Sequence, residues 1–219
     1  EIYRCDWSSD VCSSDLVSAT AFGLLNDHFL ALVGAQFGFP LWHGLRAVAG
    51  DATVLRLTLF GKTRDGKAFV RHVVDAIGFA LYLPGIEMTL AAKLYTPDVG
   101  ERQMLFEHLD KLRRNDLLLL DRGYPACWLF AALLQRGLHF CVRVDSLNFK
   151  VIKQFVRSGL REQIVFLPAP SKQDALDYEI PTEPCQVRLI LQVFGHKTRV
   201  LVTSLLDTDA YPADEFSAL

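Results

Sequence analysis

The 219-residue chain lacks a strong charge of either sign. Its 23 lysines and arginines nearly balance its 25 acidic residues, for a formal net charge of −2, so net charge gives no argument for binding nucleic acid. The sequence also lacks an apolar run approaching the roughly 20 residues of a membrane-spanning helix, and no membrane partner is expected. Hydrophobic residues still make up 51% of the chain, enough for one large domain or two small ones.

Cysteine and histidine are present in small numbers and form no metal-binding motif. The five cysteines contain no C-x-x-C pair, and the six histidines show neither H-x-H nor H-E-x-x-H spacing. Structural zinc and a disulfide framework are therefore not expected. We expect Cys127, Cys141 and Cys185 to be buried free thiols in a reducing cytoplasm.

The two ends of the sequence do not read as complete protein. Residues 6–16, D-W-S-S-D-V-C-S-S-D-L, match the translation of a common sequencing-adapter oligonucleotide at every codon. We therefore interpret residues 1–16 as adapter read-through and leave them out of fold reasoning. Residues 207–219 read as a loop and the first turn of a helix near Pro212, and one turn of helix is not stable alone. We expect the native chain to extend beyond both ends.

Four consecutive leucines, residues 117–120, give the strongest local signal. Such a run is typical of a strand buried on both faces. It stops at Asp121, before Arg122-Gly123 and a helical pattern from Ala126. Asp121 therefore lies where a buried strand gives way to a helix, at the edge where α/β sheets collect their chemistry. The structural alternative is that Asp121 only hydrogen-bonds its turn or caps the helix.

A second acid, Asp51, lies at the start of another predicted strand or just inside it. Residues 45–59 are rich in valine, leucine and threonine. Aspartate is depleted in strands, which makes the position unusual, although a turn after Gly50 would also explain it. If the strands of Asp51 and Asp121 are neighbours, the two carboxylates offer the hard oxygen ligands that Mg²⁺ prefers. Two such ions can clamp the attacking and leaving oxygens of a phosphoryl transfer.

The remaining chain alternates helical and strand patterns. They predict helices over residues 17–37, 98–114 and 126–135, a hairpin of strands over 76–83 and 88–95, and a strand over 139–144. Residues 145–206 contain four prolines and three strand patterns, which makes this segment β-rich. The order indicates an α/β fold: a mixed sheet with flanking helices and a β-rich insertion.

Two charged features have a structural and a functional interpretation. Asp98 and Glu101 have capping-box spacing, so we interpret Glu101 as a capping residue of the helix that starts near Asp98. Between Arg136 and Arg161, Asp145 is the only acid among several basic residues. A charge run is usually a solvated face, but a local basic excess in a near-neutral chain supports phosphate contacts.

Four motifs, taken in order and spacing, resemble those of bacterial insertion-sequence transposases of the DDE type, in the insertion sequence 4 group. They are G-D-A-T-V-L-R-L (50–57), V-G-E-R (99–102), L-L-L-L-D-R-G-Y (117–124) and L-L-Q-R-G-L-H-F-C-V-R-V (133–144). Residues 201–216 are similar to the segment that precedes the third acid in such proteins. The resemblance covers residues 17–219 and identifies them as a catalytic-domain fragment.

This resemblance implies a ribonuclease H-like fold with Asp51 and Asp121 as the first two catalytic acids and metal ligands, for Mg²⁺ or Mn²⁺. The third acid of the family is a glutamate in a Tyr-Arg-Glu-type pattern, which this sequence lacks, so we expect it beyond Leu219; Glu215 matches a segment upstream of that pattern. The implied domains follow in chain order. They are a helical N-terminal remnant (17–44), the catalytic core (45–144), the β-rich insertion (145–206) and the start of the truncated C-terminal catalytic helix region (207–219).

The implied function is metal-dependent cleavage and strand transfer of double-stranded DNA at transposon ends and target, by a homodimer in a synaptic complex at the bacterial nucleoid in the cytoplasm. Arg122, Lys150, Lys153 and Arg157 are the candidates for binding the DNA backbone. We expect the fragment to be inactive alone. Two alternatives are a non-catalytic DNA-binding remnant and a ribonuclease H-like nuclease unrelated to transposition.

Overall fold

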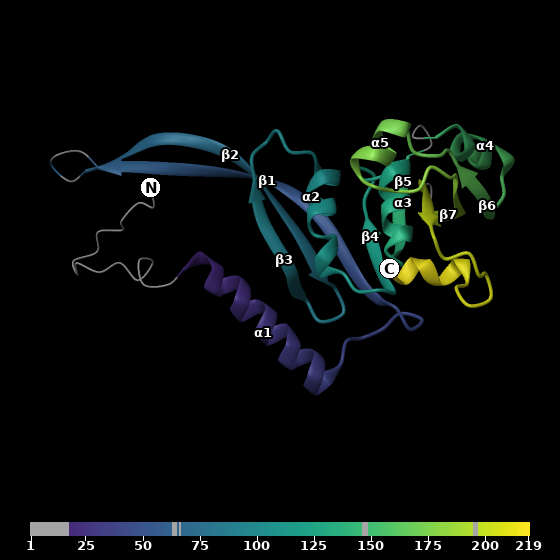
Figure 1. Cartoon of the computed structure of the whole chain (residues 1–219), viewed down its shortest axis with the longest axis horizontal. Helices are drawn as coiled ribbons and strands as arrows, with labels where there is room; N and C mark the ends of the chain where they lie inside the picture. The colour runs from purple at the N-terminus through teal and green to yellow at the C-terminus, as the bar shows by residue number, and fades with distance from the viewer. Residues whose placement is uncertain (1–17, 63–64, 66, 146–148, 195–196) are drawn as a thin grey trace. The chain divides into compact units, whose positions relative to one another are not determined.

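The computed structural model describes residues 18–62, 65, 67–145, 149–194 and 197–219 (Figure 1). The segment interpreted as adapter, residues 1–16, lies outside this part. The chain divides into two units, residues 1–39 and 40–219. The first contains helix α1 (Ala19–Phe37), which confirms the predicted helix, and Ser18 caps it by accepting a hydrogen bond from the Thr20 amide. In the described part of the chain, no helix has both the length and the apolar character to cross a membrane.

The second unit is built on an eight-stranded mixed sheet in the order β3-β2-β1-β4-β5-β8-β7-β6 (Figure 1). In chain order the strands are β1 (Arg46–Lys62), β2 (Ala68–Leu83), β3 (Met88–Tyr95), β4 (Asp116–Leu120), β5 (His139–Val144), β6 (Glu162–Leu167), β7 (Cys185–Phe194) and β8 (Lys197–Thr203). The first three strands are antiparallel, β4 and β5 run parallel to β1, and β8, β7 and β6 continue the sheet antiparallel. This mixed sheet has the ribonuclease H-like arrangement, which confirms the predicted fold class.

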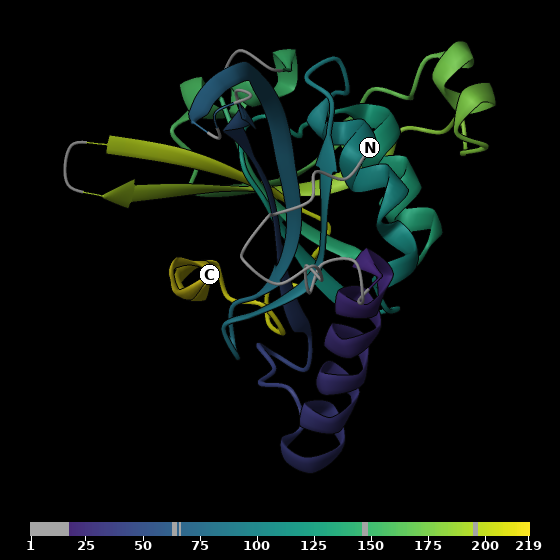
Figure 2. The same ribbon diagram turned by 90° about the vertical axis from the view of Figure 1, so that its left-hand side faces the viewer.

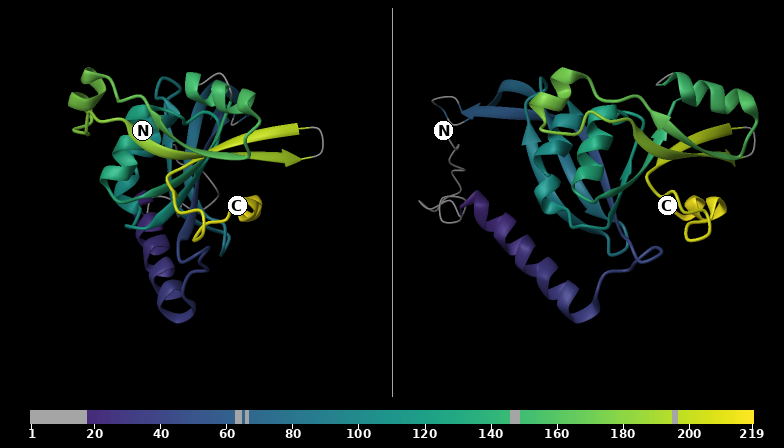
Figure 3. Two further views of the ribbon diagram at one scale, coloured as in Figure 1. Left: turned by 90° about the vertical axis from the view of Figure 1, so that its right-hand side faces the viewer. Right: turned by 45° about the vertical axis from the view of Figure 1, so that its right-hand side comes forward.

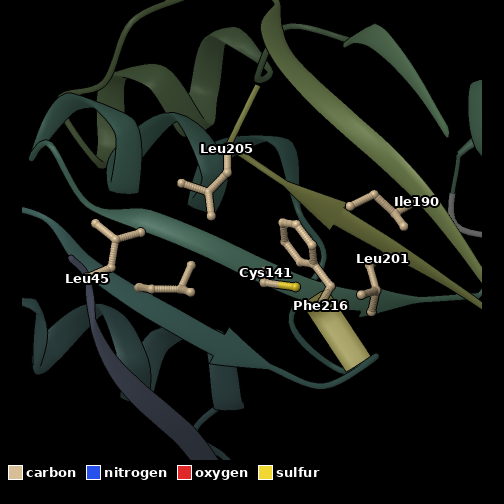
Figure 4. Packing of buried hydrophobic residues seen from close by; sticks show 7 residues of the cluster. Leu45, Cys141, Ile190, Leu201, Leu205 and Phe216 are labelled. Atoms are coloured by element: carbon tan, nitrogen blue, oxygen red, sulfur yellow. The ribbon is translucent and has the colours of Figure 1, made fainter. Parts of the chain in front are cut away.

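Helices and the C-terminal segment cover opposite faces of this sheet (Figure 2). Helices α2 (Glu101–Glu107) and α3 (Cys127–Gln135) lie on one face and bury Leu105 and Leu129 completely. On the other face the 3₁₀ helix η3 (Ala213–Ala218) inserts Phe216 into a cluster with Leu117 and Cys141 (Figure 4). Leu117 and Leu118 are both fully buried, so the leucine run is covered on both faces, as its sequence predicts.

Two hairpins run beyond the neighbouring strands. Residues 55–62 of β1 pair only with residues 68–76 of β2, and this two-stranded ribbon projects from the sheet (Figure 1). Leu55, Leu57 and Val73 are exposed on it. At the other end of the sheet, the far half of the β7–β8 hairpin likewise pairs only with itself (Figure 3).

The β-rich segment holds more helix than expected and joins the main sheet. It contains α4 (Lys150–Ser158) and α5 (Lys172–Asp177) besides its three strands, and β8 pairs directly with β5. The sequence G-H-K at residues 195–197 also predicts a hairpin turn, and residues 195–196 of that turn lie outside the described residues. The predicted domain boundaries stay a prediction.

The capping interpretation of Glu101 is wrong. Helix α2 begins at Glu101, three residues later than predicted, and its N-cap is Gly100, which offers no side-chain cap. The helix ends at Glu107 and a 3₁₀ turn, η2 (Leu109–Lys111), follows it. The Glu101 side chain is therefore available for another role.

A buried ion pair fixes the register of β1 against β4. Arg46 and Asp116 form the first pair in the parallel register, and Arg46 Nε and Nη2 donate to the two Asp116 carboxylate oxygens at 2.8 and 2.6 Å. Both side chains are more than 90% buried, and the Arg113 amide donates to Asp116 Oδ2 at 2.7 Å. A two-point contact of this kind is specific in geometry, so a slip of the register would separate a buried charge from its partner.

We expect Asp116→Ala to destabilise the protein by about 3–5 kcal/mol, because the change leaves the Arg46 guanidinium buried and unpaired. Denaturant unfolding followed by circular dichroism measures the effect. Asp214→Ala is the matched control, since it breaks the exposed Arg161–Asp214 ion pair and should change stability little. Equal effects of the two substitutions would contradict the importance of the buried pair.

Candidate functional site

Two acids meet where β1 and β4 run side by side. Gly50 pairs with Leu120 at the end of the parallel register, so Asp51 and Asp121 are the next residues on neighbouring strands. Neighbouring strands lie about 4.8 Å apart, which places these backbones close together. Gly50 allows the close packing here, since a Cβ at this position would lie 3.1 Å from Leu120 Cδ2. The structure thus supports the predicted neighbourhood of the two strands.

Asp51 and Asp121 are exposed, and each uses one oxygen for its own backbone. The Ala52 amide donates to Asp51 Oδ1 at 2.8 Å, and the Gly123 amide donates to Asp121 Oδ1 at 2.7 Å. Asp51 lies inside β1, paired with Ala80, so the turn interpretation of Asp51 is wrong. One oxygen of Asp121 does hydrogen-bond its own turn, as the structural alternative predicts. Asp121 does not cap the following helix, because the N-cap of α3 is Ala126 and no side chain makes a cap bond there. The second carboxylate oxygen of Asp121 is directed to no hydrogen-bond donor among the described residues.

A third carboxylate, Glu101, joins these two, and sequence reasoning missed it. A Cβ on Gly123 would lie 2.6 Å from Glu101 Oε2 and 3.1 Å from Asp121 Oδ1, so both oxygens gather over this glycine. Arg102 Nε donates to the Tyr124 carbonyl at 3.2 Å and fastens the start of α2 to the same loop. The motifs V-G-E-R and L-L-L-L-D-R-G-Y, separate in sequence, therefore meet in space.

The electrostatics of the site reflect the proximity of Glu101 to the other two acids. Partial burial raises the pKa of Glu101, and the nearby charges of Asp121 and then Asp51 raise it further, against a lowering effect of Arg102. Burial also raises the pKa of Tyr124, as do the charges of Glu101, Asp51 and Asp121. Each cause is physical: desolvation disfavours a charged group, and like charges disfavour one another.

The donor set has the chemistry of a Mg²⁺ or Mn²⁺ site. These ions prefer carboxylate oxygens as ligands, and a bound Mg²⁺ ion usually keeps several of its water ligands as well. Gly123 leaves open the space that a side chain would fill between Glu101 and Asp121. Among the described residues, no three side chains of His, Cys, Asp or Glu converge closely enough to hold one ion as they stand. The three acids are exposed, so their side chains have room to turn toward a cation.

The four predicted DNA-binding residues fall into two places. Lys150, Lys153 and Arg157 lie on the exposed side of α4, opposite the buried Ile152 and Phe155. Their spacing of three and four residues puts them on one helix face. Arg122 is exposed directly after Asp121, with its Nη1 3.9 Å from Asp145 Oδ2. The helix therefore gathers three of the four into one basic surface.

Other residues considered in the sequence lie apart from this site. Glu215 Oε2 lies 2.6 Å from His43 Nε2, so the one late glutamate is engaged elsewhere. Cys127, Cys141 and Cys185 are free, as predicted; the last two are buried and Cys127 is half-buried. Burial raises the pKa of the Cys141 thiol to about 12, which keeps it protonated and unreactive.

Comparison with protein-family models finds no match, and comparison with curated proteins finds none either. Among solved structures, the chain is similar to one described as "Cryo-EM structure of piggyBac transposase synaptic complex with hairpin DNA (SNHP)". The identity is 13%, the TM-score is 0.47, and the match covers 74% of this chain and 34% of that one. An identity and a TM-score this low carry no functional argument. The chain spans about a third of the length of that transposase chain.

The raised pKa of Glu101 gives a prediction for the metal-free protein. At a pH between the ordinary glutamate pKa of 4.5 and the raised pKa of Glu101, the Glu101 carboxyl keeps its proton in the folded state and loses it in the unfolded chain. Glu101 therefore lowers the stability of the wild type as the pH rises through this window. Glu101→Gln removes the charge, so its stability relative to wild type should increase through that window and then level off. Denaturant unfolding in a chelator at a series of pH values measures this.

Glu107→Gln, at the other end of α2, is the matched control with the opposite sign. Hydrogen bonds from Tyr95 and then Lys93 hold the pKa of Glu107 below its usual range. The stability that Glu107 provides is therefore present at neutral pH and disappears as pH falls, so this variant should become less stable relative to wild type as pH rises. The same trend in both variants would contradict the assignment of Glu101 to the acid cluster.

Proposed function

We propose that this chain is a catalytic-domain segment of a DDE-type transposase of the insertion sequence 4 group, which cleaves and joins DNA with Asp51 and Asp121 as metal ligands. One observation supports the proposal above the others: the register of β1 and β4 brings these two acids to one edge of a ribonuclease H-like sheet. The motif resemblance assigns the same two residues independently of the fold.

The chemistry follows from the residues at that edge. Asp51 and Asp121 would hold a divalent cation, which when bound supplies Lewis-acid stabilisation of charge on phosphate oxygens. Arg122, next to Asp121, would bind a phosphate oxygen and fix the strand at the site, because a guanidinium fork matches phosphate geometry. The basic face of α4, residues Lys150, Lys153 and Arg157, would hold the duplex by its backbone, without reading sequence.

The partner is double-stranded DNA, first the transposon end and then the target. We also propose that two copies act together in a synaptic complex at the bacterial nucleoid, as in the resembling family. The third acid of that family's pattern would lie in sequence that follows Leu219. In that case the chain as given binds DNA and metal but does not complete strand transfer.

Asp51→Asn and Asp121→Asn test the site. In the uninterrupted native reading frame, each change should lower Mg²⁺- or Mn²⁺-dependent nicking of transposon-end DNA by more than about 100-fold, since even outer partners of metal ligands typically change metal affinity or activity by 10–100-fold. DNA affinity should not fall, because a negative charge near phosphates is removed. Asp75→Asn is the control, an exposed acid of β2 with an ion pair to Arg56 outside the site.

The products separate the proposal from its two alternatives. Nicking followed by joining of the 3′ end to target DNA supports a transposase. Metal-dependent cleavage without joining favours a ribonuclease H-like nuclease. Salt-dependent DNA binding with no cleavage in the complete reading frame favours a non-catalytic remnant, and unchanged cleavage by Asp51→Asn contradicts the assigned site.

The basic face of α4 predicts the salt dependence of DNA binding. The logarithm of the DNA-binding constant falls linearly with the logarithm of the salt concentration, and each cation that binds a phosphate adds about 0.9 to the steepness of this slope. Lys153→Ala should therefore reduce the steepness by about 1, and the triple variant Lys150→Ala/Lys153→Ala/Arg157→Ala should reduce it by about 3. Fluorescence anisotropy with a labelled duplex across a salt series measures both. Lys172→Ala on α5 is the matched exposed control and should leave the slope unchanged; equal slopes for Lys153→Ala and Lys172→Ala would rule out α4 as the DNA surface.

A further inference from the structure

The acid at the start of α2 does not cap the helix. Glu101 is the first residue of the helix, but the N-cap is Gly100 and no side-chain cap bond is made there. Its carboxylate lies beside Asp121 over Gly123 and is destabilised by partial burial and by two like charges. Helix capping therefore does not account for the place of this carboxylate beside Asp121.

Glu101 is also held in place from both sides. Met104 and Leu105, which follow it in α2, are completely buried and fix the helix against the sheet. Arg102 binds the Tyr124 carbonyl in the loop that follows Asp121. The backbone position of Glu101 relative to the loop after Asp121 is therefore set by packing and by a hydrogen bond.

A buried hydroxyl independently points to a missing group at this place. Tyr124 is completely buried, and its hydroxyl has no hydrogen-bond partner among the described residues. The acidic charges that act on this side chain are Glu101, Asp51 and Asp121. A buried polar atom without a partner is rare and costs stability, so it calls for a ligand, an ion with its waters, or a shift of a neighbour.

We propose that Glu101 is the third carboxylate of a divalent-cation site that it shares with Asp51 and Asp121, with the Tyr124 hydroxyl facing the bound ion's water or carboxylate shell. This inference rests on the proposed function, since it extends the same site. The cation is a hard divalent ion, Mg²⁺ or Mn²⁺, because all three charged groups are carboxylates. A bound cation would offset the repulsion among the three acids, and a water or carboxylate oxygen around it would give the Tyr124 hydroxyl a hydrogen-bond partner.

The site has its third acid within residues 51–121 under this assignment. Strand β1 supplies Asp51, helix α2 supplies Glu101, and Asp121 is the residue that follows β4. A glutamate beyond Leu219 is then an addition to a cation site that is already made of three carboxylates. The chain as given should accordingly bind Mn²⁺ in the absence of DNA.

Isothermal titration of the full chain with MnCl₂ tests this assignment without an activity assay. Glu101→Gln should weaken Mn²⁺ binding by about 10-fold or more, as removal of groups around a metal commonly does. Gly123→Ala should weaken it as well while keeping every carboxylate, because the added methyl displaces the end of the Glu101 side chain from its place over the glycine. Glu107→Gln, on the same helix, should bind as wild type, and circular dichroism checks that each variant is folded.

The outcomes distinguish this inference from the proposed function. If Asp51→Asn and Asp121→Asn weaken Mn²⁺ binding while Glu101→Gln and Gly123→Ala do not, Glu101 is no ligand and the proposed site stands. If none of the four changes affects Mn²⁺ binding, both assignments fail. Weakening by Glu107→Gln to the same degree as by Glu101→Gln would show a general charge effect and would overturn the assignment of Glu101.

Discussion

The parallel pairing of β1 with β4 is the interaction on which the site depends. At one end of the pair, the buried Arg46–Asp116 ion pair fixes the register; at the other, Gly50 packs against Leu120. The chain therefore reaches Asp51 and Asp121 in step, one residue beyond the last pair. A slip of one residue would turn alternate side chains to the wrong face and unpair a buried charge, so the same interaction that stabilises the sheet also aligns the acids.

Much of the fold could be predicted from local sequence, and the reason is visible in the structure. Four leucines require burial on both faces, and helices on one side with η3 on the other provide it. Strand β3 and the helix after Asp121 are likewise found near their predicted positions, whereas β2 begins at Ala68, well before the predicted start at residue 76. Local patterns could not predict which strands pair across the sheet. The pairing of β8 with β5 and the length of the β1–β2 ribbon depend on contacts between segments that are distant in sequence.

The candidate site shows the same limit more sharply. Asp51 and Asp121 could be selected because an acid at a strand end is unusual and because their motifs resemble a known family. Glu101 was missed because its spacing from Asp98 fits a capping box, a local explanation that the actual helix start at Glu101 removes. The signal that could have found it was the V-G-E-R motif itself: its arginine binds the loop after Asp121, and its glutamate comes with it.

The length of β1 has a mechanical consequence. One uninterrupted strand of 17 residues runs from Arg46, anchored in the core, through Asp51 and out along the two-stranded ribbon. Beyond Gly50 this strand pairs with β2 alone, and beyond residue 54 the paired part of β2 no longer has β3 as a neighbour. The ribbon and Asp51 are therefore parts of the same strand, whereas Asp121 follows β4 and has no chain link to the ribbon within the sheet. A displacement of the ribbon would act on the backbone of Asp51 and not directly on that of Asp121.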